Sequence, residues 1–401
     1  MTALRLVLTT PVFAMLAGVI GLMGMINASI FPYQSLIGIE RLGLSHTAFA
    51  AVLVLASVIG VSASVYVGIL SDQRAIRRKI ALVTAAMGVV GAGLMVVAPG
   101  PAMFVLAQGL LLPVAGSVFG QSFALNRLAS LRYPAEREGI QATIRSAMSV
   151  TFLALLIFWT WAFAAGAEVL WVYLSGTLSS LALLVLIWLA WPRDGQTDWA
   201  DRPSGLRLSQ ALRQLARPMV SLRLLCLGAV ASSGILYMVL ISLVFDQAAG
   251  RGNADVALYV GLVAGWEVPF MLLLPRYMHR APRTRLLLVG TALYVSHLLL
   301  MPALAPTPLI WVMPFVAGLG GTAMLILPIS YYQDLLASQP GTSAAMLALQ
   351  KLVGDVLAAL AFAIGTAVAG YDLVAVMGSA IAMAGAVGLW WLDRRHPFAA
   401  A

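Results

Sequence analysis

Charged residues and cysteine are both scarce in this sequence. Of its 401 residues, 15 are Asp or Glu and 24 are Lys or Arg, so that 10% are charged. An ordinary soluble domain has about 25%, and this shortage excludes a water-soluble globule. The single cysteine, Cys226, excludes a disulfide within the chain and a metal centre built on cysteines. We expect neither a cofactor nor a bound metal.

Apolar residues, by contrast, make up 61% of the chain and gather in long continuous runs. A helix needs about 20 apolar residues to cross a hydrocarbon layer about 30 Å thick. Twelve runs meet this length, with approximate limits 11–38, 47–70, 80–99, 102–125, 141–164, 168–191, 220–246, 255–275, 286–304, 309–331, 343–369 and 373–392. Continuous runs predict helices and not the alternating strands of a membrane barrel. The first run is too long for a signal peptide, so we predict an uncleaved span and an all-α membrane protein.

The basic residues are distributed unevenly between these runs. With both termini in the cytoplasm, 20 of the Lys and Arg residues fall in inside connectors and two, Arg41 and Arg251, in outside connectors. Basic residues near span ends resist translocation, so this bias predicts cytoplasmic termini in a bacterial inner membrane. The bilayer therefore accounts for the net charge of +9, and we expect no nucleic-acid partner.

The longest inside connector separates six spans from six. We predict an N-terminal half at 1–191, a cytoplasmic linker at 192–218 and a C-terminal half at 219–401. Within the linker, LSQALRQLARP from Leu208 forms either a short amphipathic helix at the membrane surface or a solvated basic segment.

A recognisable motif, GILSDQRAIRRK, begins at Gly68 between the second and third runs. It resembles the signature loop of the major facilitator superfamily, in which a glycine is followed by an acidic residue and a basic cluster. The resemblance implies twelve helices in two pseudo-symmetric six-helix halves, and a conformational latch formed by Gly68, Asp72, Arg77 and Arg78. Ala75 departs from the family pattern, which usually has glycine there. A basic loop that only orients the chain is the alternative.

Shorter stretches are similar to the sugar efflux transporters of bacteria. They are QSFALNR from Gln121, AGWEVPFML from Ala264, YYQDLLASQPG from Tyr331 and the arginine of TIRSAMSV, Arg145. Members of that family export small sugars and glycosides and use the proton gradient. The resemblance implies a monomeric secondary transporter with alternating access and proton antiport, but it does not imply which sugar is carried.

Ionisable side chains within the spans are candidates for function, because a charge at the bilayer centre costs on the order of 3 kcal/mol. Glu267 lies near the midplane of the eighth span. Burial favours the protonated form of a lone carboxyl, as proton coupling or binding of a substrate hydroxyl requires. A structural hydrogen-bonded carboxyl is the alternative. His297 in the ninth span is expected to be a neutral core histidine with its hydrogen bonds satisfied.

Lys351 and Asp355 are four residues apart, on one face of the eleventh span. They form either a self-neutralising pair or a pair in which protonation of Asp355 frees Lys351 to meet the substrate. Arg145 lies a few residues inside the fifth span. Either it extends to the cytoplasmic surface, or, as the family resemblance implies, it pairs with an acidic residue or donates to the substrate.

Uncharged polar residues suit the recognition of sugar hydroxyls beside an aromatic ring. The candidates in the predicted spans are Asn27, Gln34, Gln121, Tyr237 and Trp266. Hydrogen bonds between helices use the same residue types. Glycine-rich GLGGT from Gly318 is not preceded by a strand, so we predict close helix packing or bending there and not a nucleotide loop.

Three other functions remain to be weighed. A multidrug/proton antiporter for amphipathic or cationic compounds is compatible with the many Met, Trp and Phe residues, although the fifth span lacks the glycine-proline element of drug antiporters. An intramembrane enzyme is disfavoured, because neither HExxH nor GxSxG occurs. A passive channel or a nutrient sensor is not separated from a carrier by sequence alone.

Overall fold

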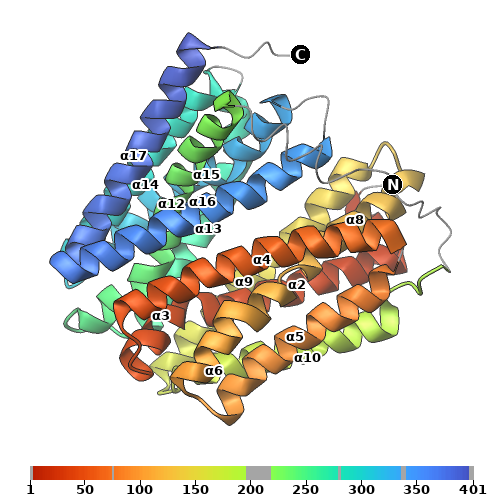
Figure 1. Cartoon of the computed structure of the whole chain (residues 1–401), viewed down its shortest axis with the longest axis horizontal. Helices are drawn as coiled ribbons and strands as arrows, with labels where there is room; N and C mark the ends of the chain where they lie inside the picture. Colours follow the sequence, from red (N-terminus) through yellow and green to blue (C-terminus); the bar gives the residue numbers. More distant parts are fainter. Residues whose placement is uncertain (1–2, 75, 196–217, 279–280, 336–339, 397–401) are drawn as a thin grey trace. The chain divides into compact units, whose positions relative to one another are not determined.

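The computed structural model describes residues 3–74, 76–195, 218–278, 281–335 and 340–396. Within these ranges the regular structure is entirely helical, and twelve helical segments are long and apolar enough to cross a membrane (Figure 1). The predicted twelve-helix, all-α architecture is confirmed. The linker sequence 208–217 lies outside the described residues.

Several spans are built from more than one helical segment. The segments before the linker are α1 (Ala3–Thr9), α2 (Pro11–Ile30), η1 (Phe31–Tyr33), α3 (Gln34–Leu36), η2 (Ile37–Arg41), α4 (His46–Arg74), α5 (Arg77–Val97), α6 (Pro101–Leu106), η3 (Ala107–Leu111), α7 (Leu112–Ala115), α8 (Val118–Ala129), η4 (Ser130–Arg132), α9 (Arg137–Ala164) and α10 (Trp171–Ala190). Those after it are α12 (Pro218–Gln247), α13 (Asn253–Met278), α14 (Arg283–Leu304), η5 (Pro308–Val312), α15 (Met313–Leu335), α16 (Pro340–Val368) and α17 (Tyr371–Arg395). Glycines with φ of +91° and +76°, Gly166 and Gly370, allow the tight turns before α10 and α17.

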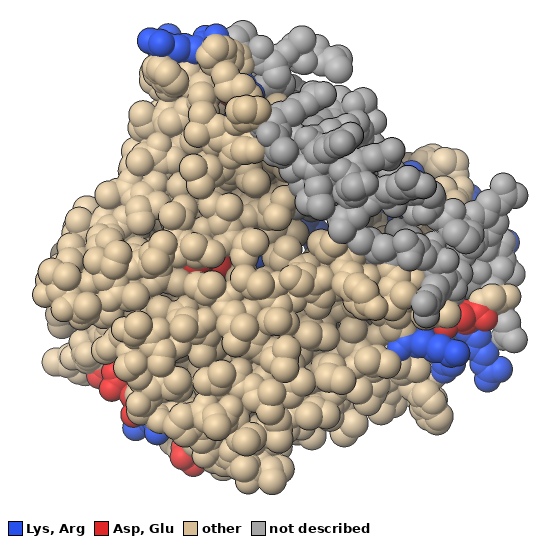
Figure 2. Space-filling model, in the orientation of Figure 1, with Lys and Arg blue, Asp and Glu red and all other residues tan. Residues whose placement is uncertain are grey.

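The surface of the molecule matches a lipid environment. Figure 2 shows that uncharged residues cover most of the face drawn, and that Lys, Arg, Asp and Glu occur in small groups. Large apolar side chains, including Trp161, Trp188 and Val368, are exposed. A soluble protein would cover such side chains, whereas the hydrocarbon of a bilayer accommodates them.

The chain divides into two compact units. The first contains Met1–Tyr33 and Val58–Leu206. In it, α2 packs against α9 and α10, and α5 packs against α10. A Cβ at Gly24 would lie 2.5 Å from the carbonyl oxygen of Met148, so only glycine allows α2 to approach α9 this closely.

The second unit contains Gln34–Ser57 and Arg207–Ala401. In it, α12 packs against α16 and α17, α14 against α15 and α17, and α13 against α15. The segment 34–57 joins this unit through polar contacts. Ser35 Oγ donates to the carbonyl oxygen of Val239 at 2.6 Å, and His46 Nε2 lies 3.2 Å from the hydroxyl oxygen of Tyr371.

The glycines of the GLGGT sequence bring α15 close to two neighbouring helices. A Cβ at Gly318 would lie 2.6 Å from Trp266 Cβ on α13. A Cβ at Gly320 would lie 2.6 Å from both the Gly290 oxygen and the Tyr294 nitrogen of the α14 backbone. The predicted role in close helix packing is confirmed, and α15 is thereby fixed against α13 and α14.

We expect Gly320→Ala to destabilise the second unit, because the methyl group would meet backbone atoms that side-chain rotation cannot move. Overpacking of this kind costs about 1–3 kcal/mol. Gly265→Ala on α13 is the matched control, because no heavy atom of the described residues lies within 4 Å of a Cβ there. Thermal unfolding of the purified protein in detergent measures both. Equal stability of the two variants would contradict the close packing.

Candidate functional site

Glu267 lies near the middle of α13 with its carboxylate against α15. A Cβ at Gly321 of α15 would lie 2.7 Å from Glu267 Oε1 and 3.3 Å from the Tyr294 ring on α14. The absence of a side chain at Gly321 therefore provides the space for the carboxylate, beside the edge of a tyrosine. In the described part of the chain, Glu267 forms no ion pair. It is a half-buried acid between three helices, without a cation to hold it ionised.

The backbone around Glu267 is tied to α15 as well. Thr322 Oγ1 lies 3.2 Å from the carbonyl oxygen of Glu267 and 2.8 Å from that of Gly318. The preceding residue, Trp266, is exposed, and its ring centroid lies 5.0 Å from Phe315 and 6.1 Å from Phe270. An exposed aromatic ring thus stands on the residue directly before the carboxylate; rings and carboxylates are the groups that bind the ring faces and hydroxyls of carbohydrates.

Lys351 and Asp355 make the contact expected from their spacing on α16. Lys351 Nζ lies 2.6 Å from Asp355 Oδ2. The two ends of the pair differ in environment, because the lysine side chain is 64% exposed and the aspartate side chain 7%. The carboxylate is therefore buried and neutralised by a lysine that remains accessible.

Three candidates, Asn27, Gln121 and Arg145, belong to the first unit. Asn27 donates from Nδ2 to the carbonyl oxygen of Met23 in its own helix, at 2.9 Å. Gln121 is buried, and its Oε1 has no hydrogen-bond partner among the described residues. Arg145 is exposed on α9. The three side chains thus range from buried to exposed, and among the described residues no hydrogen bond or ion pair joins one of them to another.

Two further candidates, Gln34 and Tyr237, belong to the second unit and are buried. Gln34 Nε2 and the Tyr237 hydroxyl have no hydrogen-bond partner in the part of the chain that the structure describes. Of the candidate residues in this unit, the structure joins Lys351 to Asp355, and Trp266 and Glu267 are neighbours in sequence on α13. The structure shows no contact between the two carboxylates.

The loop that resembles the superfamily motif is anchored by an acid outside the motif. Arg78 N donates to Asp194 Oδ1 at 2.8 Å, and Arg78 Nη2 donates to the carbonyl oxygen of Trp188. Asp194 therefore caps the start of α5 and ties it to the end of α10. Arg77 is buried and donates to Ser71 Oγ at 3.3 Å.

The other two latch candidates are Asp72 and Gly68. The side chain of Asp72 lies outside the described set. Among the described residues, no heavy atom lies within 4 Å of the position of a Cβ at Gly68.

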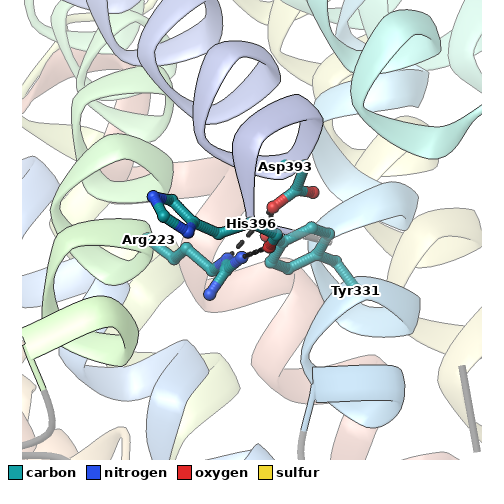
Figure 3. Close-up of polar contacts among 4 residues, drawn as sticks. All are labelled: Arg223, Tyr331, Asp393 and His396. Atoms are coloured by element: carbon teal, nitrogen blue, oxygen red, sulfur yellow. Dashed lines mark hydrogen bonds and ion pairs between the residues drawn. The ribbon is translucent and has the colours of Figure 1, made fainter. Parts of the chain in front are cut away.

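A second polar anchor, which sequence reasoning missed, lies in the second unit (Figure 3). Arg223 Nε lies 3.0 Å from Asp393 Oδ1, and the hydroxyl of Tyr331 donates to the same oxygen at 2.8 Å. Arg223 also donates from Nη2 to the carbonyl oxygen of His396 at 2.6 Å. These contacts join the start of α12 to the ends of α15 and α17. We call the four residues the Arg223 anchor.

The sequence contains a signal for this anchor. Arg223 lies among apolar residues near the start of the seventh apolar run, and Asp393 directly follows the last one. The side chains are 6% and 15% exposed. A charge flanked by apolar residues at each of two span ends is a reason to look for a buried pair.

Comparison with known proteins identifies relatives by sequence similarity. No protein-family profile matches the chain. A protein of Deinococcus radiodurans, whose name assigns it provisionally to the sugar efflux transporters, is 26% identical over 401 residues, covering 94% of this chain and 97% of the relative. Sugar efflux transporter B of Salmonella typhimurium is 25% identical over 316 residues, covering 75% of each chain.

Solved structures share the fold. The nucleoside transporter NupG superposes with a TM-score of 0.77 at 13% identity, covering 96% of this chain and 99% of that one. A bacterial homologue of the human lysosomal transporter Spinster gives a TM-score of 0.65 at 15% identity, covering 95% and 92%. The names of these relatives and neighbours are those of transporters and not of enzymes.

Proposed function

We propose that this chain, a multi-pass transporter with the major facilitator superfamily fold and a resemblance to the bacterial sugar efflux transporters, exports small sugars or glycosides in exchange for protons. The observation that carries the proposal is the lone carboxylate of Glu267, held over Gly321 beside the exposed Trp266. The names of the two curated relatives support a sugar as the substrate class, and they do not favour the multidrug alternative.

In the proposed cycle, Glu267 binds either a proton or the substrate. A proton from outside neutralises the carboxylate, and its release to the cytoplasm leaves an acceptor for a sugar hydroxyl. Trp266 supplies the ring on which the sugar packs. Both termini lie in the cytoplasm, and the halves alternate access around the site. Proton entry provides the energy, since a membrane potential of 100 mV alone is worth about 2.3 kcal/mol per charge.

The substrate class is tested by counterflow in proteoliposomes. Vesicles containing the purified chain are preloaded with an unlabelled glycoside, and uptake of the labelled compound is followed. We expect saturable exchange of sugars. Exchange of cationic dyes without sugar exchange would support the multidrug alternative, and flux that never saturates would indicate a channel.

Arg145 and the latch residues have separate proposed roles. We assign Arg145, exposed on α9, as a donor to the substrate. Arg77 and Arg78 belong to the proposed latch at the cytoplasmic ends of the helices. The contacts of Arg78 with Asp194 and Trp188 support this role, because they couple the start of α5 to the end of α10.

We also assign Lys351 to the substrate site, with Asp355 as its titratable partner. Lys351 is the accessible member of the pair, so protonation of the buried Asp355 would release the ammonium group to donate to a sugar hydroxyl. We expect Lys351→Met to raise the half-saturation concentration for sugar counterflow about tenfold, the loss of one hydrogen bond to a charged donor.

The double variant Lys351→Met/Asp355→Leu separates this role from charge neutralisation. It removes both charges, so a pair that only neutralises itself would recover normal counterflow in the double variant. We expect the double variant to stay as impaired as Lys351→Met. Recovery would limit the pair to a structural role.

A further inference from the structure

A cluster of polar aromatic residues surrounds His297 inside the second unit. His297 on α14 is fully buried. Its ring centroid lies 5.0 Å from that of Tyr237 on α12, 5.9 Å from that of Tyr259 on α13 and 5.4 Å from that of Tyr294 on α14. Three helices thus direct tyrosine rings toward one imidazole. We call these four residues the His297 cluster.

Most polar atoms of this cluster lack partners in the protein. Among the described residues, the hydroxyls of Tyr237 and Tyr259 and both ring nitrogens of His297 are buried without a hydrogen bond, as is Thr291 Oγ1 on α14. The expected burial of His297 is confirmed, and the described residues do not show which groups satisfy its ring nitrogens. Each unpaired buried group costs about 1–3 kcal/mol, so native proteins pair such groups with protein or with ordered water.

The His297 cluster connects to Glu267 at one end. Tyr294 belongs to the cluster, and its ring also lies 3.3 Å from the position of a Cβ at Gly321. Glu267 Oε1 lies 2.7 Å from that same position. The carboxylate and the edge of the Tyr294 ring thus lie beside the same position on α15.

At its other end the cluster reaches the start of α13. The Tyr259 ring centroid lies 6.2 Å from that of Trp311, and the guanidinium of Arg251 lies 5.2 Å from the centre of the same indole. Arg251 is held there by donating from Nε to the carbonyl oxygen of Ala305 at 2.8 Å. This is the end of the second unit that faces outside in the proposed orientation.

We propose that the His297 cluster binds ordered water and carries protons between Glu267 and the outer end of the second unit. A neutral imidazole has one donor and one acceptor nitrogen, so it takes a proton from water on one side and releases the other proton to water on the opposite side. The charged groups at the two ends are Glu267 at one end and, at the other, Arg251 with Asp255, whose Oδ1 lies 3.8 Å from Arg251 Nη1. From α17, Ser379 contributes only a hydroxyl, which donates to the Val295 carbonyl oxygen at 3.2 Å.

The proton path rests on the proposed antiport, whereas the water site does not. Radiolytic hydroxyl labelling of the full chain in detergent tests the water site directly, because water bound next to a buried tyrosine yields radicals at that ring. We expect Tyr237 and Tyr259 to be labelled as fast as the exposed Tyr66. Tyr173 is the matched control, since it is equally buried but its hydroxyl accepts from Gln108 Nε2 at 2.7 Å. Labelling of Tyr237 and Tyr259 as slow as that of Tyr173 would overturn the proposal.

Tyr259→Phe and His297→Phe test the proton path. We expect each variant to slow sugar uptake driven by a pH gradient at least about tenfold, as removal of a proton-transfer group does, while sugar counterflow stays normal. Tyr173→Phe should change neither rate. Equal loss of both rates in Tyr259→Phe and His297→Phe would assign these residues a structural role and overturn the path. If the wild-type chain exchanged sugar without proton coupling, both the proposed antiport and the proton path would be refuted. The hydroxyl labelling would still decide whether the His297 cluster binds water.

Discussion

Glu267→Gln is expected to abolish sugar accumulation driven by a pH gradient and to leave sugar counterflow in place. Glutamine keeps the size and hydrogen-bonding capacity of the side chain but cannot exchange a proton. In vesicles with an acidic interior, one pH unit is worth about 1.4 kcal/mol per proton and sustains about a tenfold sugar gradient in one-for-one exchange. We expect this gradient in the wild-type chain and equal concentrations in the variant, as measured with a labelled glycoside.

Glu168→Gln is the control for this experiment, because it makes the same chemical change at an exposed residue between α9 and α10. It should accumulate sugar like the wild-type chain. Full accumulation by Glu267→Gln would remove Glu267 from the coupling mechanism. If Glu267→Gln lost both counterflow and accumulation, Glu267 would have a role in substrate binding or folding. That result would give no evidence that it couples transport to protons.

Arg223→Met is expected to lower the stability of the second unit by about 3–5 kcal/mol, the usual result of removing one partner from a buried ion pair. The variant leaves Asp393 with the Tyr331 hydroxyl but without its cation. It also removes the hydrogen bond to the His396 carbonyl oxygen at the end of α17. Thermal unfolding in detergent measures the effect.

The double variant Arg223→Met/Asp393→Leu should recover part of this loss, because the unpaired carboxylate is no longer present. Arg394→Met is the matched control. Arg394 is exposed and lies 4.7 Å from the centre of the Trp390 ring, a contact worth less than about 1 kcal/mol. An equal effect of Arg223→Met and Arg394→Met would show that the Arg223 anchor does not stabilise the fold.

Features set by local sequence were predictable. The twelve spans follow from the length and apolarity of each run, which the bilayer requires of any single helix. The Lys351–Asp355 contact follows from a four-residue spacing on one helix. The glycines from Gly318 to Gly321 indicated close packing because small residues are the usual means of bringing membrane helices together.

Features set by distant parts of the chain were not predictable. Arg223 and Asp393 are 170 residues apart, and only the packing of α12 against α17 brings them together. Composition likewise gives no indication that Gly321 faces Glu267. The burial of His297 was predicted correctly, but the three tyrosine rings that surround it come from three helices, and the sequence gives no sign that they meet.

The exchange of sugar for protons is tested most directly by the proton movement that sugar itself drives. Proteoliposomes of the wild-type chain, with a pH indicator inside and equal pH on both sides, receive a saturating glycoside outside. Antiport predicts that sugar entry expels protons, so the interior becomes alkaline, and that Glu267→Gln abolishes this change. An interior that becomes acidic would indicate symport, and sugar entry without a pH change would indicate uncoupled transport. Either result would contradict proton antiport.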